Sequence, residues 1–165
     1  MNRVLTITII LISFSIKLSG QVNDSSIRKI VLENNITDSL YVFGKWNKNK
    51  GTETHLKYLG IIKSNHTNYK IMISSWFWGM SKRATSRILV YNQANKYVGN
   101  YYMSMTYDLP KKIENNQIVF LNTKNSSCDK KVITRLSFKK GIPEKFFLQC
   151  KNDFGNIYSF NQEKE

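Results

Sequence analysis

The sequence predicts an all-β protein in which about eight or nine antiparallel strands follow one short helix. Apolar and polar residues alternate with a period of two from residue 40 onward, which is typical of half-buried strands. Clusters of Asn, Asp, Ser, Gly and Pro separate these segments, and we find no internal repeat or domain linker. Because neighbouring segments are joined as hairpins, the pattern favours an up-and-down meander or barrel, with a two-sheet β-sandwich as the alternative.

Residues 1–20 have the three parts of a cleavable secretory signal peptide. Arg3 gives a positive start, residues 4–16 form an apolar run, and residues 17–20 end in small side chains. The run of 13 residues is shorter than the roughly 20 that a transmembrane helix needs. No other segment is long and apolar enough to span a membrane. We therefore expect a single β domain over residues 21–165, exported to the periplasm, the outer-membrane surface or the extracellular space.

The chain is strongly basic, with a formal net charge of +14. Removal of Arg3 and Lys17 with the signal peptide leaves 23 basic and 11 acidic residues, a net charge of +12. Such a charge attracts anionic partners, for example nucleic acid, acidic glycans or lipid headgroups. A composition rich in Lys, Asn and Ile is also what an AT-rich genome imposes, so charge alone does not select a partner.

A short amphipathic helix is expected at the start of the mature chain. Residues 24–26 (Asp-Ser-Ser) offer an N-cap, Ile27, Ile30 and Val31 form an apolar face, and residues 34–35 (Asn-Asn) end the helix. A first β-strand is the alternative. The strands that follow are expected at residues 40–46, 55–63, 69–78, 86–92, 97–107, 117–121, 132–138, 145–151 and 156–161.

Two independent signals define a hairpin of strands 86–92 and 97–107. The first strand is apolar at even positions, whereas the second strand has its aromatic and Met side chains mostly at odd positions. The four-residue loop between them sets the register Asn92–Tyr97, Val90–Gly99 and Ile88–Tyr101. Opposed residues share a face in an antiparallel pair, so loop length and hydrophobic pattern predict the same register.

The last three strands, 132–138, 145–151 and 156–161, are expected to pair in order as a meander. Each has most of its apolar residues on one alternating face, and short turn sequences join them. The register forms three rows of side chains: Leu136, Phe146 and Phe160; Thr134, Leu148 and Tyr158; and Val132, Cys150 and Asn156.

Cys128 and Cys150 are the two cysteines, and an exported protein meets an oxidising compartment. The expected register places Cys150 opposite Val132, which is about 13 Å along an extended chain from Cys128, whereas a disulfide needs Cα atoms within roughly 7 Å. Either residues 128–131 curl back and the disulfide forms, or two thiols stay free. The turn-forming residues around Cys128 favour the disulfide. The spacing does not match a zinc site, and we expect no metal or cofactor.

The two histidines, His55 and His66, are the candidates for acid–base catalysis of the kind that a small, basic, secreted ribonuclease performs. They lie about 36 Å apart if residues 55–63 form a straight strand, although a bend near Gly60 shortens this distance. Histidines on solvent-exposed turns fit the sequence better. We find no G-x-S-x-G motif and no tight carboxylate pair, and we expect no catalytic residue.

The stretch Trp-Phe-Trp at residues 76–78 lies close to basic residues and is the best candidate for a binding surface. In a strand, Trp76 and Trp78 share one face, and Arg83 and Arg87 follow them. Aromatic rings beside basic side chains stack on bases or sugars, or lie in a membrane interface. The alternative is a strand buried on both faces, for example beneath the N-terminal helix.

The Gly44-Lys45-Trp46 sequence, after a short helix and before a run of antiparallel strands, resembles the lipocalin signature. The resemblance implies an up-and-down barrel that holds a small apolar ligand and whose closed end is sealed by Trp46. The helix, the mature length and the strand number agree with it, whereas residues 106–108 (Thr-Tyr-Asp) match the second motif of the family only in scrambled order.

These observations predict a non-enzymatic binding protein whose ligand is either a small apolar molecule or an anionic surface. A secreted hydrolase acting on RNA or glycans is one alternative. A structural or assembly component of the cell envelope is another.

Overall fold

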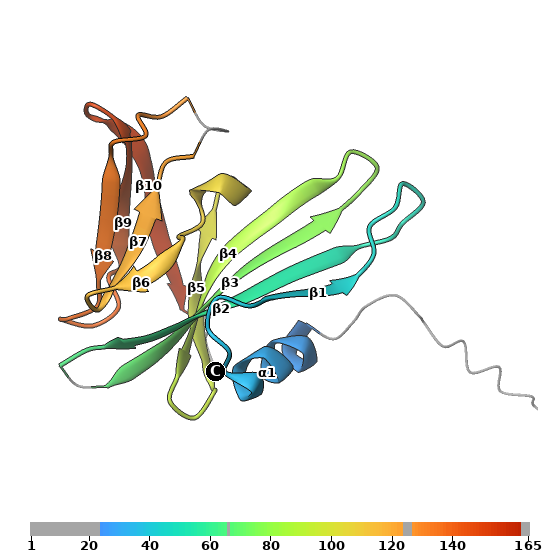
Figure 1. The fold of residues 1–165 in the computed structure, drawn as a ribbon, viewed down its shortest axis with the longest axis horizontal. Helices are drawn as coiled ribbons and strands as arrows, with labels where there is room; N and C mark the ends of the chain where they lie inside the picture. Colours follow the sequence, from blue (N-terminus) through green and yellow to red (C-terminus); the bar gives the residue numbers. More distant parts are fainter. Residues whose placement is uncertain (1–23, 66, 124–126, 163–165) are drawn as a thin grey trace, which may run out of the picture.

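The computed structural model describes residues 24–65, 67–123 and 127–162, which form an antiparallel β-structure with one helix, α1 (Asp24–Asn34) (Figure 1). A seven-stranded and a three-stranded sheet contain the ten strands of these residues, which confirms the all-β fold class. The predicted signal peptide, residues 1–20, and His66 lie outside the described residues.

The large sheet is open, because its strands follow the order β1-β2-β3-β4-β5-β10-β9 and its edge strands, β1 and β9, do not pair. The barrel that the sequence favoured is therefore not formed. Its strands are β1 (Leu40–Gly44), β2 (Glu53–Lys63), β3 (Asn68–Trp78), β4 (Arg83–Asn92), β5 (Tyr97–Met103), β9 (Lys145–Lys151) and β10 (Phe154–Gln162). The small sheet has β6 (Lys112–Glu114), β7 (Gln117–Leu121) and β8 (Ile133–Ser137) in this order, after a 3₁₀ turn, η1 (Thr106–Asp108).

Helix α1 lies against one face of the large sheet (Figure 1). Its residues Ile27, Val31 and Leu32 are buried at helical spacing, and they pack against a cluster from β2, β3 and β4: Leu56, Tyr58, Met72, Leu89 and Tyr91. Two ion pairs between residues four apart, Asp24–Arg28 and Lys29–Glu33, support the helix. The predicted helix is confirmed, and the alternative of a first strand is wrong.

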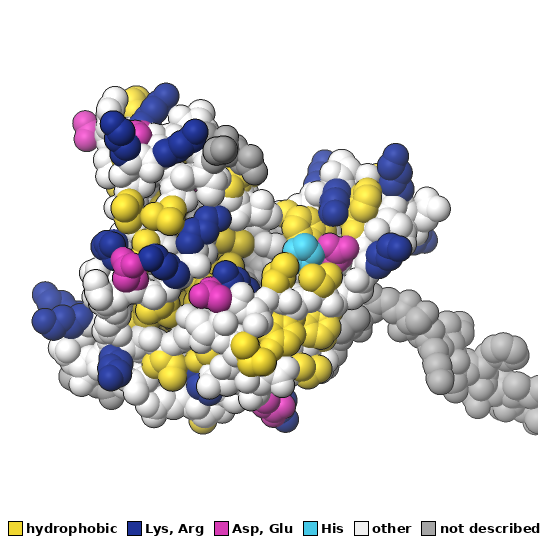
Figure 2. Space-filling view, in the orientation of Figure 1, with side chains coloured by type: hydrophobic (Ala, Val, Ile, Leu, Met, Phe, Trp, Pro, Cys, Tyr) yellow, Lys and Arg dark blue, Asp and Glu magenta, His cyan; other side chains and the backbone are white. Residues whose placement is uncertain are grey.

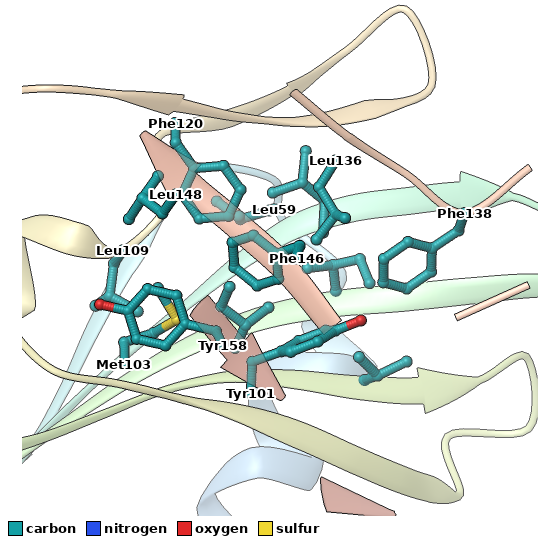
Figure 3. Packing of buried hydrophobic residues seen from close by; sticks show 14 of the residues in the cluster. Leu59, Tyr101, Met103, Leu109, Phe120, Leu136, Phe138, Phe146, Leu148 and Tyr158 are labelled. Carbon is teal, nitrogen blue, oxygen red and sulfur yellow. The ribbon is translucent and has the colours of Figure 1, made fainter. Parts of the chain in front are cut away.

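The opposite face of the large sheet packs against the small sheet, and the main hydrophobic core lies between them (Figure 3). Phe146 of β9 lies within this core. Its ring centroid is 5.1 Å from that of Tyr101, 5.2 Å from that of Phe120 and 5.5 Å from that of Tyr158. These three rings come from β5, β7 and β10, so one side chain joins both sheets.

The hairpin β4–β5 has the predicted register over most of its length. Ile88 lies opposite Tyr101 and Val90 opposite Gly99, but a bulge then places Tyr91, rather than Asn92, opposite Tyr97. β5 ends at residue 103, four residues before the predicted end, because the chain turns into η1.

In the predicted C-terminal meander, the antiparallel pairing of β9 with β10 is confirmed, whereas the pairing of β8 with β9 is wrong. β8 pairs with β7, and β10 lies between β9 and β5, so β8 and β9 are not ladder neighbours. Phe146 lies opposite Tyr158 rather than Phe160, a shift of two residues that keeps the same side chains on the buried face. The reason is that alternation determines which face is buried, but it does not determine which strand is the partner.

The disulfide between Cys128 and Cys150 is confirmed, with a Cα–Cα distance of 4.5 Å. The chain curls as the turn-forming residues predict. The backbone N–H of Val132 donates to the carbonyl of Asp129, and the N–H of Asp129 donates to the carbonyl of Cys150. Residues 128–132, which precede β8, are thereby held against the end of β9.

Candidate functional site

The candidate site lies on two hairpin ends that extend together from the core, residues 44–54 between β1 and β2 and residues 76–87 between β3 and β4. We call these two segments the arm. Both loops point in the same direction, away from the small sheet (Figure 1). The first loop is closed by the side chain of Asn47, whose Oδ1 accepts the N–H groups of Asn49 and Gly51 at 2.9 and 3.0 Å. The second is a tight turn in which the N–H of Lys82 donates to the carbonyl of Gly79 at 3.2 Å.

Trp46 connects the two loops of the arm. Its Nε1 donates to the carbonyl of Gly79 at 2.9 Å, and the Nζ of Lys82 lies 5.3 Å from the centroid of a Trp46 ring. The same ammonium lies 5.4 Å from the ring centroid of Phe77, so two aromatic rings hold it by cation–π attraction. Trp46 is half-buried on an open sheet and does not seal a barrel. The lipocalin-like resemblance, which depends on Gly44 and Trp46, stays a prediction.

The strand register brings the four residues singled out in the sequence onto one face of the arm, the face that also carries α1. Trp78 pairs with Arg83, Trp76 with Thr85, and Arg87 with Ser74, which alternates with these tryptophans along β3. We call Trp76, Trp78, Arg83 and Arg87 the helix-side patch. The predicted strand began at residue 86, whereas β4 begins at Arg83.

Contacts within the helix-side patch order its rings. The two indoles are stacked with centroids 5.7 Å apart, and the guanidinium carbon of Arg83 lies 5.8 Å from the centroid of Trp78. Trp78 Nε1 donates to Thr85 Oγ1 at 3.2 Å. Trp76 is 41% exposed, so α1 does not bury this end of β3. The patch thus presents a fixed aromatic surface with cationic groups beside it.

The opposite face of these hairpins, at the base of the arm, carries a hydrogen-bonded His55–Glu53 pair that the sequence pattern did not predict. His55 Nε2 lies 2.6 Å from Glu53 Oε1, and the His55 ring meets Phe77 edge-on with centroids 4.8 Å apart. The bond to His55, together with the N–H of Trp46 at 3.3 Å from Oε2, holds the pKa of Glu53 below its ordinary value. His55 lies inside β2 and is half-buried, so its predicted place on an exposed turn is wrong. The alternation of residues 53 and 55 in a strand was the available signal.

The arm has a strong charge asymmetry. Its two segments contain six basic residues and one carboxylate, Glu53, and that carboxylate is already hydrogen-bonded. The basic residues are Lys45, Lys48, Lys50, Lys82, Arg83 and Arg87. Lysine and arginine side chains gather around this end of the molecule (Figure 2). An anionic partner therefore meets attraction at the arm with little local repulsion.

Within residues 24–65, 67–123 and 127–162, no group of three or more His, Cys, Asp or Glu side chains is placed to hold a metal ion. Over the same residues, no helix has both the length and the apolarity to cross a membrane. Comparison of the chain with protein-family models, curated proteins and solved structures finds no match.

Proposed function

We propose that the protein is an exported, non-enzymatic protein that binds an anionic surface through the arm, with the helix-side patch as the contact. The observation that carries this proposal is that Trp76, Trp78, Arg83 and Arg87 share one face at the exposed end of β3–β4. The disulfide between Cys128 and Cys150 fits an oxidising, extracytoplasmic compartment.

The chemistry of the patch suits an extended array of phosphate, sulfate or carboxylate groups. Arg83 and Arg87 supply guanidinium groups, which bind such oxyanions with two parallel hydrogen bonds. Trp76 supplies a half-exposed flat ring that packs on an apolar ring or chain of the partner. The open sheet removes the barrel mouth on which binding of a small apolar ligand depended.

Salt-dependent retention on immobilised heparin, used as a soluble polyanion probe, tests the proposal. We expect the double variant Arg83→Gln/Arg87→Gln to elute at lower salt and to reduce the slope of log K against log salt by roughly one for each anionic group that it no longer binds. We expect Trp76→Ala to weaken binding roughly tenfold, as removal of an aromatic stacking partner does elsewhere.

The matched control is Lys139→Gln/Lys140→Gln, which removes the same charge from the exposed β8–β9 loop, far from the arm. If this control weakens binding as much as the arginine variant, the positive charge acts without a site and the proposal is wrong. Equal far-ultraviolet circular dichroism of all variants excludes unfolding as the cause.

A further inference from the structure

We infer that the anionic surface is a phospholipid bilayer and that the β3–β4 turn enters its headgroup region with Met80 foremost. This inference rests on the proposed function and names its partner. It is carried by Met80, which the helix-side patch does not include, together with the aromatic and basic side chains around it.

Met80 is the most exposed large apolar side chain of the described residues, at 78%. It lies within the tight turn of residues 79–82 between two long strands, directly after Gly79. Around Gly79, no atom lies within 4 Å of the position that a Cβ would occupy, so this side of the turn is open. A protruding apolar side chain at the tip of a hairpin is unfavourable in water and favourable at the boundary of acyl chains.

Aromatic side chains lie directly behind this tip. Trp78 precedes Gly79, and Trp46 donates its indole N–H to the carbonyl of Gly79. Trp is enriched at membrane interfaces because its ring is apolar while its N–H finds a polar partner at the headgroup level. The arrangement therefore provides an apolar tip followed by an interfacial aromatic layer.

Basic residues flank the tip on both faces of the hairpin. Lys82 lies over Trp46 and Phe77 on one face, and Arg83 lies over Trp78 on the other. Lys48 and Lys50 are exposed on the neighbouring loop. Each basic side chain near an anionic membrane strengthens binding roughly fivefold, and cations on both faces suit an edge-on approach of the hairpin.

The exposed side chain of Met80 is the reason to propose a lipid bilayer, rather than a soluble polyanion, as the anionic partner. A polysaccharide or nucleic acid has phosphate, sulfate or carboxylate groups for the cations and rings for the tryptophans. Neither of them provides an apolar layer beneath its charges, whereas a bilayer has acyl chains directly below the phosphates. The order of side chains from Met80 back to the tryptophans and cations follows this order of layers.

Intrinsic fluorescence provides the test, because the three tryptophans of the chain all belong to the arm. The chain from Gln21 onward contains every described element and lacks the apolar run of residues 4–16, which would bind lipid by itself. We expect vesicles of phosphatidylglycerol and phosphatidylcholine to shift the emission to the blue, brominated lipids to quench it, and high salt to reverse the binding. We expect no binding to pure phosphatidylcholine.

Met80→Gln should weaken vesicle binding roughly tenfold and leave heparin elution unchanged, whereas Met80→Leu should retain vesicle binding. The matched control is Phe154→Gln, at an exposed apolar residue on β10, which should change neither. Heparin binding without vesicle binding, or equal vesicle binding by Met80→Gln, refutes the inference and leaves the proposed function standing. Failure to bind both heparin and vesicles refutes the two together.

Discussion

Removal of the Cys128–Cys150 disulfide should destabilise the protein by about 3 kcal/mol. The bridge joins residues 22 positions apart in the sequence. In the chain-entropy model, closing a loop of this length lowers the entropy of the unfolded state by about 11 cal/mol/K, which gives about 3 kcal/mol at 25 °C. For a domain of this size, we expect the thermal midpoint to fall by roughly 10 °C.

Urea unfolding of the double variant Cys128→Ala/Cys150→Ala measures this free energy against the oxidised protein. Dithiothreitol serves as an internal control, because it should lower the midpoint of the oxidised protein to that of the variant and leave the variant unchanged. Asn122→Ala is a second control. It keeps the bridge but removes the hydrogen bonds from the Asn122 amide to the carbonyls of Asp129 and Cys150, at 2.8 and 3.0 Å, and should cost about 1 kcal/mol.

Oxidised and reduced protein that unfold within about 0.5 kcal/mol of each other would contradict this reasoning. Such a result would mean that the loop before β8 is already ordered without the bridge, by its own turn and by the Asn122 bonds. A destabilisation by Asn122→Ala as large as that of the double variant would lead to the same conclusion.

Three further predictions concern the fold and the arm. Phe146→Ala should lower the free energy of unfolding by roughly 3–5 kcal/mol, because it leaves a cavity between the two sheets. Phe147→Ala, at a neighbouring position that is 44% exposed, should lower it by less than about 1 kcal/mol. Urea unfolding measures both. Gly99→Ala should destabilise the protein by about 2 kcal/mol or more. Gly99 has a φ of +154°, and an added Cβ would lie 2.4 Å from the carbonyl oxygen of Asn161. Gly79→Ala is the control, because its Cβ would enter open space and only the smaller cost of the positive φ should remain. Because the pKa of Glu53 is lowered, its ionised form stabilises the fold at pH values above its ordinary pKa of 4.5, and this contribution disappears as the pH falls through the folded value. The urea midpoint should therefore fall more steeply between pH 6 and about pH 3 for the native protein than for Glu53→Gln. Parallel curves would contradict the assignment.

Local pattern predicted those features that local physics determines. The helix, most strand positions and the β4–β5 register follow from periodicity, loop length and turn residues, all of which act over a few residues. The patch residues Trp76 and Trp78 could be placed on one face for the same reason. β6 could not be found, because three residues are too few to show alternation.

Strand partners far apart in the sequence could not be predicted from alternation. β10 pairs with β5 across more than fifty residues, and β8 turns to β7 rather than to β9. One sequence signal did mark this junction. Gly99 lies in the middle of a strand, where glycine often indicates a close backbone approach, and residue 161 of β10 lies against it. The joining of Trp46 to Gly79, and hence the whole arm, also depends on a contact between distant loops.

The length of β3 and β4 is the strongest reason to place the partner at the arm rather than at the core. Along β3, Ile71 and Met72 are buried in the clusters on the two faces of the sheet, whereas residues 76–78 belong to neither cluster. Ordering each additional residue costs about 1–2 kcal/mol of backbone entropy, and these residues recover little of it by burial in the core. A strand extension that the core does not need, and that leads to three aromatic rings, two cations and an exposed methionine, therefore supports the proposal that a partner covers the arm. Under that proposal, the cations call for an anionic partner, and Met80 calls for an apolar layer beneath the charge.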